Sequence, residues 1–382
     1  MNGIWYYAIA FILIWVVCLT FKRKLENSGF EIDFPIIMWK TQKLLGFIEK
    51  LANISPRFWK WFMNVGIVVS FAFMIFMAYA LIQSLSTIAS TPSVAILLPG
   101  VEMPGSPIFI PFIQGFIALI TVIVVHEFSH GIMAIVEKIN IKSIGLLLFA
   151  ILPGAFVEPD EEGMKKLNIL GRLRIYAAGS TANLSLALVS VLIVLFISTV
   201  AVPQFFYEDG IEITNVVEDA PAFGILKEGM IVKSINNVNV SSSENYLNAL
   251  STLKPNETVS ITTDTGTYNL ELTTNPDNNS RGFIGIQGGK HFDLKDNSLG
   301  NQIPWIFFTL AELFQWIFLL NFAIGTFNLL PMKPLDGGHM LENLLNYKFS
   351  EDITKPIVKF LTILFWLIIL FSLIYSMSMA LL

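Results

Sequence analysis

The chain has 382 residues, of which 54% are hydrophobic and only 14% are charged, whereas soluble domains are about a quarter charged. Its net charge of −5 is spread out, and no basic stripe carries interleaved aromatic residues, so nucleic acid is not expected as a partner. The single cysteine, Cys18, excludes an intrachain disulfide framework and a cysteine-based zinc site.

Long apolar runs dominate the chain, and a bilayer is crossed by roughly 20 such residues. The first run does not fit a signal peptide, because it lacks a basic leading region and three basic residues follow it at 22–24. Six runs separated largely by short connections are poorly explained as buried helices of a soluble protein. We therefore predict an α-helical polytopic membrane protein with about six spans, at 4–21, 61–85, 107–136, 175–202, 303–330 and 356–382.

Lysines and arginines gather in three connections, at 22–60, 137–174 and 331–355. Between Lys60 and Lys138 there are none at all. Basic residues mark cytoplasmic loops, so six alternating spans place these three connections in the cytoplasm and both termini outside.

The strongest chemical signal is HEFSH at 126–130, within the third span. Helix residues four apart share a face, so the imidazoles of His126 and His130 can reach one metal ion, with Glu127 beside them to act on a water. Zinc lowers the pKa of its water toward neutrality, and a glutamate can take the proton and later pass it on. Ionisable residues clustered in an apolar span are costly unless they are paired or functional.

The position of the motif predicts the depth of the metal. His130 precedes Lys138 by eight residues, which is about 12 Å of helix at about 1.5 Å per residue. The metal would therefore lie inside the membrane, nearer the cytoplasmic face, and water would reach it through a protein-lined cavity.

A catalytic zinc takes three protein ligands and keeps one position open. The acidic segment VEPDEEG at 157–163 lies in a basic loop, where solvated charges are expected. The candidates for the third ligand are Glu158, Asp160, Glu161, Asp336 and His339.

Asp336 lies in NLLPMKPLDGG at 328–338, where two prolines and two glycines interrupt the fifth span. A broken helix at membrane depth is tolerated where it faces protein or a water-filled cavity, which would present this carboxylate to a metal. The alternative is an exposed aspartate in an ordinary loop, which Lys333 mildly favours. His339 fits either a ligand or the start of a helix.

Residues 207–300 differ from the rest, since they are polar, rich in Asn, Ser and Thr, and lack a membrane-length apolar run. Short β-branched stretches alternate there with turn signals at 254–258 and 264–267. We predict a small, mostly β domain outside the cytoplasm, with a helix at 242–253 and strands at 211–217, 230–235, 258–263 and 268–273.

The segment ITNVVEDAPAFGILKEGMIVKSINNVNV at 213–240 resembles the PDZ family, particularly the PDZ modules of membrane proteases. The resemblance implies a groove that adds a peptide as an extra strand, and hence peptide contact through this PDZ-like domain. The alternative is a β spacer that binds nothing.

Three motifs in order resemble the site-2 protease family, also called the M50 intramembrane metalloproteases. They are HEFSH at 126–130, Gly179 with Asn183 in AAGSTANLSLA, and Asn328 with Pro331 and LDG at 335–337. The resemblance covers residues from about 107 to 345. One departure is Ser180, where the family more often has proline; the fold is unaffected, but a role for that turn is weakened.

The resemblance implies that Zn²⁺ is held by His126, His130 and Asp336, and that Glu127 and Asn328 are catalytic. Asn328 matches the family asparagine proposed to steady the substrate carbonyl or its oxyanion. The segment GAFVEPDEE at 154–162 resembles the membrane-associated sheet that pairs with an unwound substrate strand. The implied activity is that of a metalloendopeptidase of regulated intramembrane proteolysis, which cuts the transmembrane segments of membrane proteins.

The expected protein is a multi-pass protein of a prokaryotic plasma membrane, with the lipid bilayer and transmembrane protein substrates as partners. Two N-terminal spans and their basic loop occupy 1–100, and they look like additions to the shared core. The catalytic core then occupies 101–206 and 301–382, with the PDZ-like domain inserted at 207–300.

Other functions fit the sequence less well. A CAAX-type or HtpX-type membrane metalloprotease would want a glutamate as third ligand, and spans four to six carry no ExxxE or ExxxD. A transporter would want broken or charged segments in both halves. A membrane PDZ scaffold with a non-catalytic metal site is the remaining alternative, against which the intact motif argues.

Overall fold

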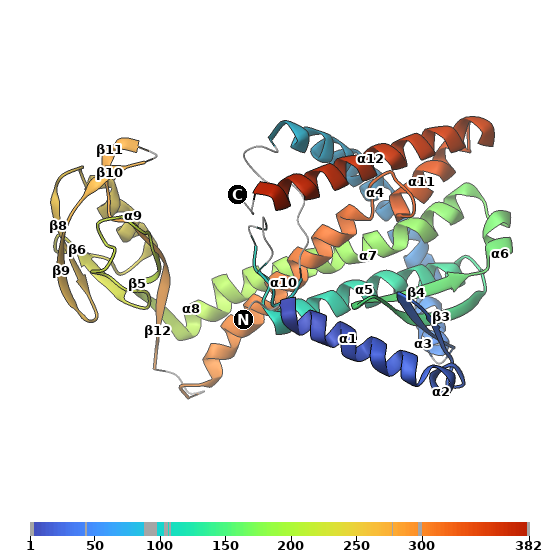
Figure 1. Ribbon diagram of the computed structural model, residues 1–382, viewed down its shortest axis with the longest axis horizontal. Helices are drawn as coiled ribbons and strands as arrows, with labels where there is room; N and C mark the ends of the chain where they lie inside the picture. The colour runs from blue at the N-terminus through green and yellow to red at the C-terminus, as the bar shows by residue number, and fades with distance from the viewer. Residues whose placement is uncertain are drawn as a thin grey trace. The chain divides into compact units, whose positions relative to one another are not determined.

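The computed structural model describes residues 4–42, 44–87, 98–102, 106, 108–276, 278–296 and 300–379. The chain divides into two compact units (Figure 1). Unit 1 comprises Met1–Val194 and Leu310–Leu382, and unit 2 comprises Leu195–Thr309.

The described residues include five helices that are long and apolar enough to cross a membrane. The first apolar helix, α1, is shorter, with 17 residues. The predicted class, an α-helical polytopic membrane protein, is confirmed. The helices that lie wholly or mostly in unit 1 are α1 (Ile4–Thr20), α2 (Lys22–Glu26), α3 (Leu45–Ile54), α4 (Pro56–Thr87), α5 (Phe112–Val136), α6 (Glu161–Lys166), α7 (Ile169–Phe196), α10 (Ile306–Phe327), α11 (Asp336–Leu345) and α12 (Glu351–Met379).

The fourth span begins at Ile169, six residues before the predicted start at 175. Asn168 explains the difference, because its side-chain oxygen accepts a 2.7 Å hydrogen bond from the backbone N–H of Gly171 and caps the helix. The first turns of α7 consequently carry Arg172 and Arg174, two basic residues that the sequence had assigned to the preceding loop.

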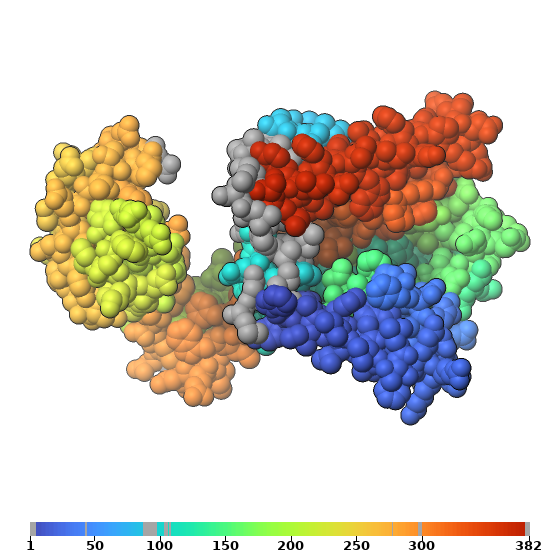
Figure 2. Space-filling model, in the orientation of Figure 1, coloured from blue at the N-terminus to red at the C-terminus, as the bar shows by residue number. Residues whose placement is uncertain are grey.

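Apolar side chains cover much of the outer surface of unit 1. Figure 2 shows α12, in red, lying on that surface. The exposed side chains of α12 include Phe360, Leu367 and Phe371. Apolar exposure on a helix of this length is typical of a surface that faces lipid.

A four-stranded antiparallel sheet in the order β1–β2–β3–β4 lies beside α5 (Figure 1). Its strands are β1 (Phe30–Asp33), β2 (Ile36–Thr41), β3 (Ile141–Phe149) and β4 (Leu152–Pro159). Strand β4 covers the first six residues of the segment 154–162 for which a sheet was implied, and the last three residues form the start of α6 instead. The first two strands come from the region that sequence analysis left without a motif, so the N-terminal residues extend the sheet of the core. Strand β4 lies at one edge.

Close packing fixes this sheet against α5. Gly131 allows the side chains of Ile48 and Val157 to approach, since a Cβ placed there would meet them at 3.2 to 3.4 Å.

At the end of α5, Glu137 forms ion pairs with Arg174 at 2.8 Å and with Lys60 at 3.1 Å. The carboxylate of Glu137 is largely buried between two cations, which joins α4, α5 and α7.

Unit 2 is a small β domain with its own core. Its main sheet has the order β12–β5–β6–β8–β9, with β7 paired to β6, and β10 and β11 form a separate hairpin. Its elements are η1 (Ile197–Ala201), α8 (Val202–Phe205), β5 (Phe206–Val216), β6 (Ile231–Ile235), β7 (Val238–Asn239), α9 (Ser243–Thr252), β8 (Thr258–Thr263), β9 (Gly266–Glu271), β10 (Thr273–Asn275), β11 (Asn278–Phe283), β12 (Ile286–Leu294) and η2 (Ile303–Trp305).

The four strands and one helix predicted in this domain are all present, within a few residues. Buried Val232, Ile235, Val259, Ile261 and Leu270 lie on three neighbouring strands and form the centre of the core. A register shift between Val232 and Ser234 allows both Val232 and Ile235 to face this core. Strand β12 was not predicted, because its glycines and polar residues hide the β pattern.

Candidate metal centre

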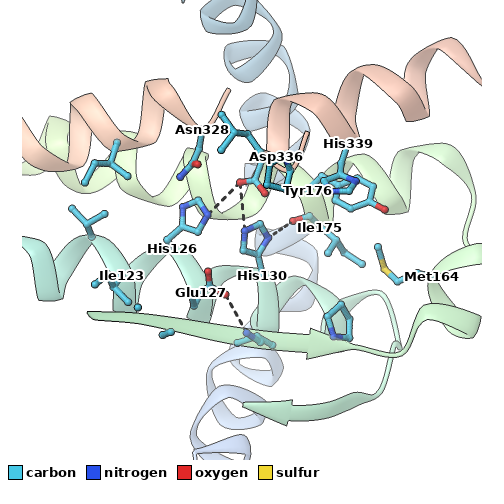
Figure 3. Close-up of a pocket in the computed structure, with 18 residues that line it drawn as sticks. Ile123, His126, Glu127, His130, Met164, Ile175, Tyr176, Asn328, Asp336 and His339 are labelled. Atoms are coloured by element: carbon cyan, nitrogen blue, oxygen red, sulfur yellow. Dashed lines mark hydrogen bonds and ion pairs between the residues drawn. The ribbon is translucent and has the colours of Figure 1, made fainter. Parts of the chain in front are cut away.

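Three side chains from distant parts of unit 1 meet at one point (Figure 3). Nε2 of His126 lies 3.3 Å from Oδ2 of Asp336, and Nε2 of His130 lies 3.5 Å from the same oxygen. One ligand atom from each residue lies within 4.8 Å of the other two. Two imidazoles and a carboxylate are donors that zinc takes in catalytic sites, so the donor set fits this ion.

Helix α5 supplies both imidazoles because residues four apart share one face. Each ring uses its other nitrogen for a contact with α7. Nδ1 of His130 lies 2.7 Å from the carbonyl oxygen of Ile175, and Nδ1 of His126 lies 3.3 Å from the side-chain amide of Asn183. Such outer contacts fix ring orientation in metal sites and leave both Nε2 atoms directed at Asp336.

The contact with Asn183 also indicates how its amide is oriented. Its Nδ2 lies beside Nδ1 of His126, while its Oδ1 is buried without a hydrogen-bond partner. If the amide oxygen and nitrogen were exchanged, Oδ1 would accept the proton that Nδ1 of His126 carries when a metal is bound through Nε2. The amide of Asn183 therefore lies where it can accept a hydrogen bond from the metal-binding tautomer of His126.

Gly179 allows α7 to approach the two imidazoles. A Cβ at this position would lie 2.5 Å from Cε1 of His126 and 2.5 Å from Nε2 of His130. Nonbonded atoms at that separation overlap, so only glycine leaves the rings in place. Gly179 to Asn183 lies in the interior of α7, which corrects the expectation of a turn there.

The segment between α10 and α11 brings Asp336 to the histidines. Gly337 packs against the backbone of Leu329, whose carbonyl oxygen would lie 2.2 Å from an added Cβ. The backbone N–H of Gly337 also donates to the carbonyl oxygen of Asn328 at 2.9 Å. The two glycines at 337 and 338 thus hold the first turn of α11, which begins with Asp336, against the broken end of the preceding helix.

Ser180 adds a contact that sequence analysis missed. Its hydroxyl, which is fully buried, donates to Oδ2 of Asp336 at 3.3 Å. This residue was noted in the sequence only as a departure from the proline that the family more often has, without a role at the metal centre. Its hydrogen bond helps to orient the carboxylate toward the imidazoles.

Glu127 is next to the three donors without belonging to their group. The backbone N–H of Val157 on β4 donates to its Oε2 at 3.1 Å. The carboxylate is thereby held between α5 and the sheet edge, on the side of the histidines away from Asp336 (Figure 3).

A cavity of about 460 Å³ opens at this centre. Its walls include Glu127, Asn328 and His339 as well as the three donors. Asn328 and His339 lie on opposite sides of Asp336 (Figure 3). The ring of His339 stacks on Tyr176, with centroids 5.2 Å apart, and burial, reinforced by Lys333, lowers the pKa of His339.

The remaining candidates for the third ligand lie outside the donor group among the described residues. Glu158 accepts a 2.8 Å hydrogen bond from Ser143, and Asp160 caps α6 by accepting one from the backbone of Gly163 at 2.9 Å. Glu161 begins α6. The acidic segment is therefore a strand end and a helix start, and Asp336 is the carboxylate that the fold brings to the histidines.

Comparison with known proteins agrees with this geometry. Residues 114–371 match the model of peptidase family M50. An uncharacterized protein of Methanocaldococcus jannaschii is 28% identical over 387 residues, covering 97% of each chain. A membrane-bound transcription factor site-2 protease homolog of Arabidopsis thaliana is 25% identical over 131 residues, covering 34% of this chain and 26% of that protein.

Two solved structures resemble part of the chain. The PDZ domain of an SdrC-like protein from Listeria monocytogenes is 25% identical, with a TM-score of 0.19, and covers 21% of this chain and 87% of that domain. The corresponding domain from Listeria innocua is 27% identical, with a TM-score of 0.20, and covers 22% of this chain and 97% of that domain.

The family match spans well over half of the sequence and includes all three donors and Glu127. The chain therefore belongs to peptidase family M50.

Proposed function

We propose that this protein is an intramembrane zinc metalloprotease, which hydrolyses peptide bonds within the transmembrane segments of membrane proteins in regulated intramembrane proteolysis. The observation that carries the proposal is the meeting of His126, His130 and Asp336, with Glu127 beside them, on helices long and apolar enough to span a membrane.

The side chains of the cavity can divide the chemistry among them. When bound by the three donors, zinc would polarise the scissile carbonyl and make a water more acidic. Glu127 would take the proton of the attacking water and deliver it to the leaving amine nitrogen. The amide of Asn328 would donate a hydrogen bond to the carbonyl oxygen as negative charge develops there.

The free edge of β4 is the proposed docking site for an unwound substrate. Backbone groups alternate along a strand, so Ala155 directs its N–H and C=O to the same edge as the N–H of Val157, which already bonds Glu127. Pro153 and Pro159 fall on this edge and have no N–H to offer. On this edge a substrate strand would therefore find N–H donors only between these two prolines, beside Glu127.

Metal analysis combined with a cleavage assay tests the proposal. The purified protein should hold about one zinc ion per chain and should cut a generic transmembrane substrate in vesicles. His126→Ala, His130→Ala and Asp336→Ala should each lose most of the zinc and the cleavage, because each removes one of three ligands. Full zinc occupancy in the His126→Ala, His130→Ala double variant would show that these histidines are not the zinc ligands.

A second function, that of a membrane PDZ scaffold with a non-catalytic metal site, gives a different outcome of the same experiment. Zinc would then be bound, but no transmembrane substrate would be cut.

For unit 2 we propose contact with substrate peptides. Deleting 209–287 behind a short Gly/Ser bridge should keep zinc and change the cleavage of substrates that still carry their outer domains, relative to trimmed ones. Unchanged relative rates would reject the contact.

The charge pattern of the loops gives a prediction of topology. In a Cys18→Ser background, a cysteine at Asn278 should react with an impermeant thiol reagent on intact cells, and one at Ser350 should not, because positively charged loops stay in the cytoplasm. Both positions are exposed on their units, so each can react. Labelling in the reverse pattern would overturn the proposed orientation and, with it, the placing of unit 2 outside the cytoplasm.

A further inference from the structure

A second cavity adjoins the metal cavity in unit 1. It has a volume of about 810 Å³, and we call it the outer cavity. The stacked rings of Tyr176 and His339 line both cavities, as do Val157 and Pro159 of β4. The end of the strand that faces the metal centre therefore continues into the wall of the outer cavity.

Arg172, in the first turn of α7, lines the outer cavity with an unpaired guanidinium. Its Nε is buried without a hydrogen-bond partner, and no carboxylate among the described residues forms an ion pair with it. Arg174, two residues further on, has the opposite environment, because it bonds both Asn64 and Glu137 at 2.8 Å. A partly buried arginine is normally paired, so Arg172 stands out.

The other basic residues of the cavity are already engaged or exposed. Lys40 bonds Glu31 at 2.9 Å, and Lys333 bonds Glu342 at 2.6 Å. Lys165 is exposed to solvent. Three glutamates, at 158, 161 and 342, also line the cavity, and the last of them is neutralised by Lys333. The positive end of the α7 dipole adds to the charge of the unpaired Arg172, so an anion is favoured beside this guanidinium.

We propose that the outer cavity is a carboxylate-binding subsite, in which Arg172 holds an aspartate or glutamate side chain of the substrate close to the scissile bond. The inference rests on the proposed protease function. A guanidinium offers two parallel N–H groups that match a carboxylate. A peptide is favoured over a lipid phosphate because the cavity shares β4 and the Tyr176–His339 pair with the metal centre. A substrate strand along β4 would reach both cavities.

The test moves a single glutamate, one residue at a time, along the segment that flanks the cleaved bond of a transmembrane substrate. Each glutamate substrate is compared with its glutamine counterpart in neutral phosphatidylcholine vesicles. Wild-type protein should prefer glutamate at one position by about 10-fold or more in kcat/KM, as expected for a hydrogen bond to a charged group. Arg172→Met should remove that preference, and R172E should replace it with a preference for lysine at the same position.

Lys166→Met is the matched control, since it removes a neighbouring positive charge that does not line the outer cavity. It should keep the preference for glutamate. Zinc content measured on every variant confirms that the metal centre is intact. Equal cleavage of glutamate and glutamine substrates at all positions by wild-type protein would overturn the subsite but leave the protease function standing.

Two further results have separate meanings. If no substrate is cut by zinc-loaded wild-type protein, the proposed function fails, and the subsite fails with it. If Arg172→Met alters cleavage only when anionic lipid is added, and equally for both substrates, then Arg172 binds a lipid phosphate and the proposed subsite is rejected.

Discussion

Glu127→Gln is expected to lower cleavage by about 10²- to 10⁴-fold while leaving the zinc content unchanged. The amide cannot accept the proton of the attacking water. The metal should stay, because Glu127 is not one of the three grouped donors. The amide oxygen can still accept the hydrogen bond that Val157 donates at 3.1 Å, so the side chain should keep its position. Zinc analysis and single-turnover cleavage of one substrate measure the two quantities.

Glu162→Gln is a suitable control for this experiment, because it makes the same chemical change at an exposed carboxylate in the first turn of α6 that lines neither cavity. Its rate should stay close to that of the wild-type protein. Native cleavage by Glu127→Gln would show that another group takes the proton. Loss of zinc in that variant would instead make Glu127 part of the metal site.

Gly179→Ala should remove most of the zinc and, with it, most of the cleavage. The added methyl group would lie within 2.6 Å of three imidazole atoms, and the rings cannot move aside without losing their contacts with Ile175 and Asn183. The surrounding α7 is otherwise suited to alanine, which stabilises helix interiors by about 1 kcal/mol relative to glycine. The unfolding temperature of the metal-free variant should therefore stay close to that of the metal-free wild-type protein.

Gly171→Ala makes the same change on the same helix and serves as the control. Its Cβ would meet no atom closer than the side-chain oxygen of Asn168, at 3.2 Å. That variant should keep its zinc. If Gly179→Ala retains full zinc affinity, the close approach of α7 to the imidazoles is not required for the site.

The site was predictable from sequence where chemistry depends on local spacing. His126 and His130 share one face of a helix because a helix repeats every 3.6 residues. The prolines and glycines near Asp336 indicate a break in the fifth span. That geometry alone left five candidates for the third ligand. The resemblance in three ordered motifs favoured Asp336, and the fold brings this residue to the histidines.

Contacts between distant segments were not predictable in the same way. The hydrogen bond of Ser180 to Asp336 joins residues 156 positions apart, and a buried serine in an apolar helix has no distinguishing pattern. Strands β1 and β2 were missed because they are short and carry charged residues, and β2 is placed by its pairing with β3. A strand whose formation depends on its partner leaves only a weak signal in its own sequence.

The two prolines on the free edge of β4 have a consequence for the catalytic cycle. Few backbone hydrogen bonds can form between Pro153 and Pro159, and each is worth only about 1 kcal/mol net. After hydrolysis the two fragments would share this small number of bonds, so each would dissociate quickly from the edge. Under the proposed function, the short pairing edge would lower substrate affinity but shorten the residence time of products, which would favour repeated turnover over capture.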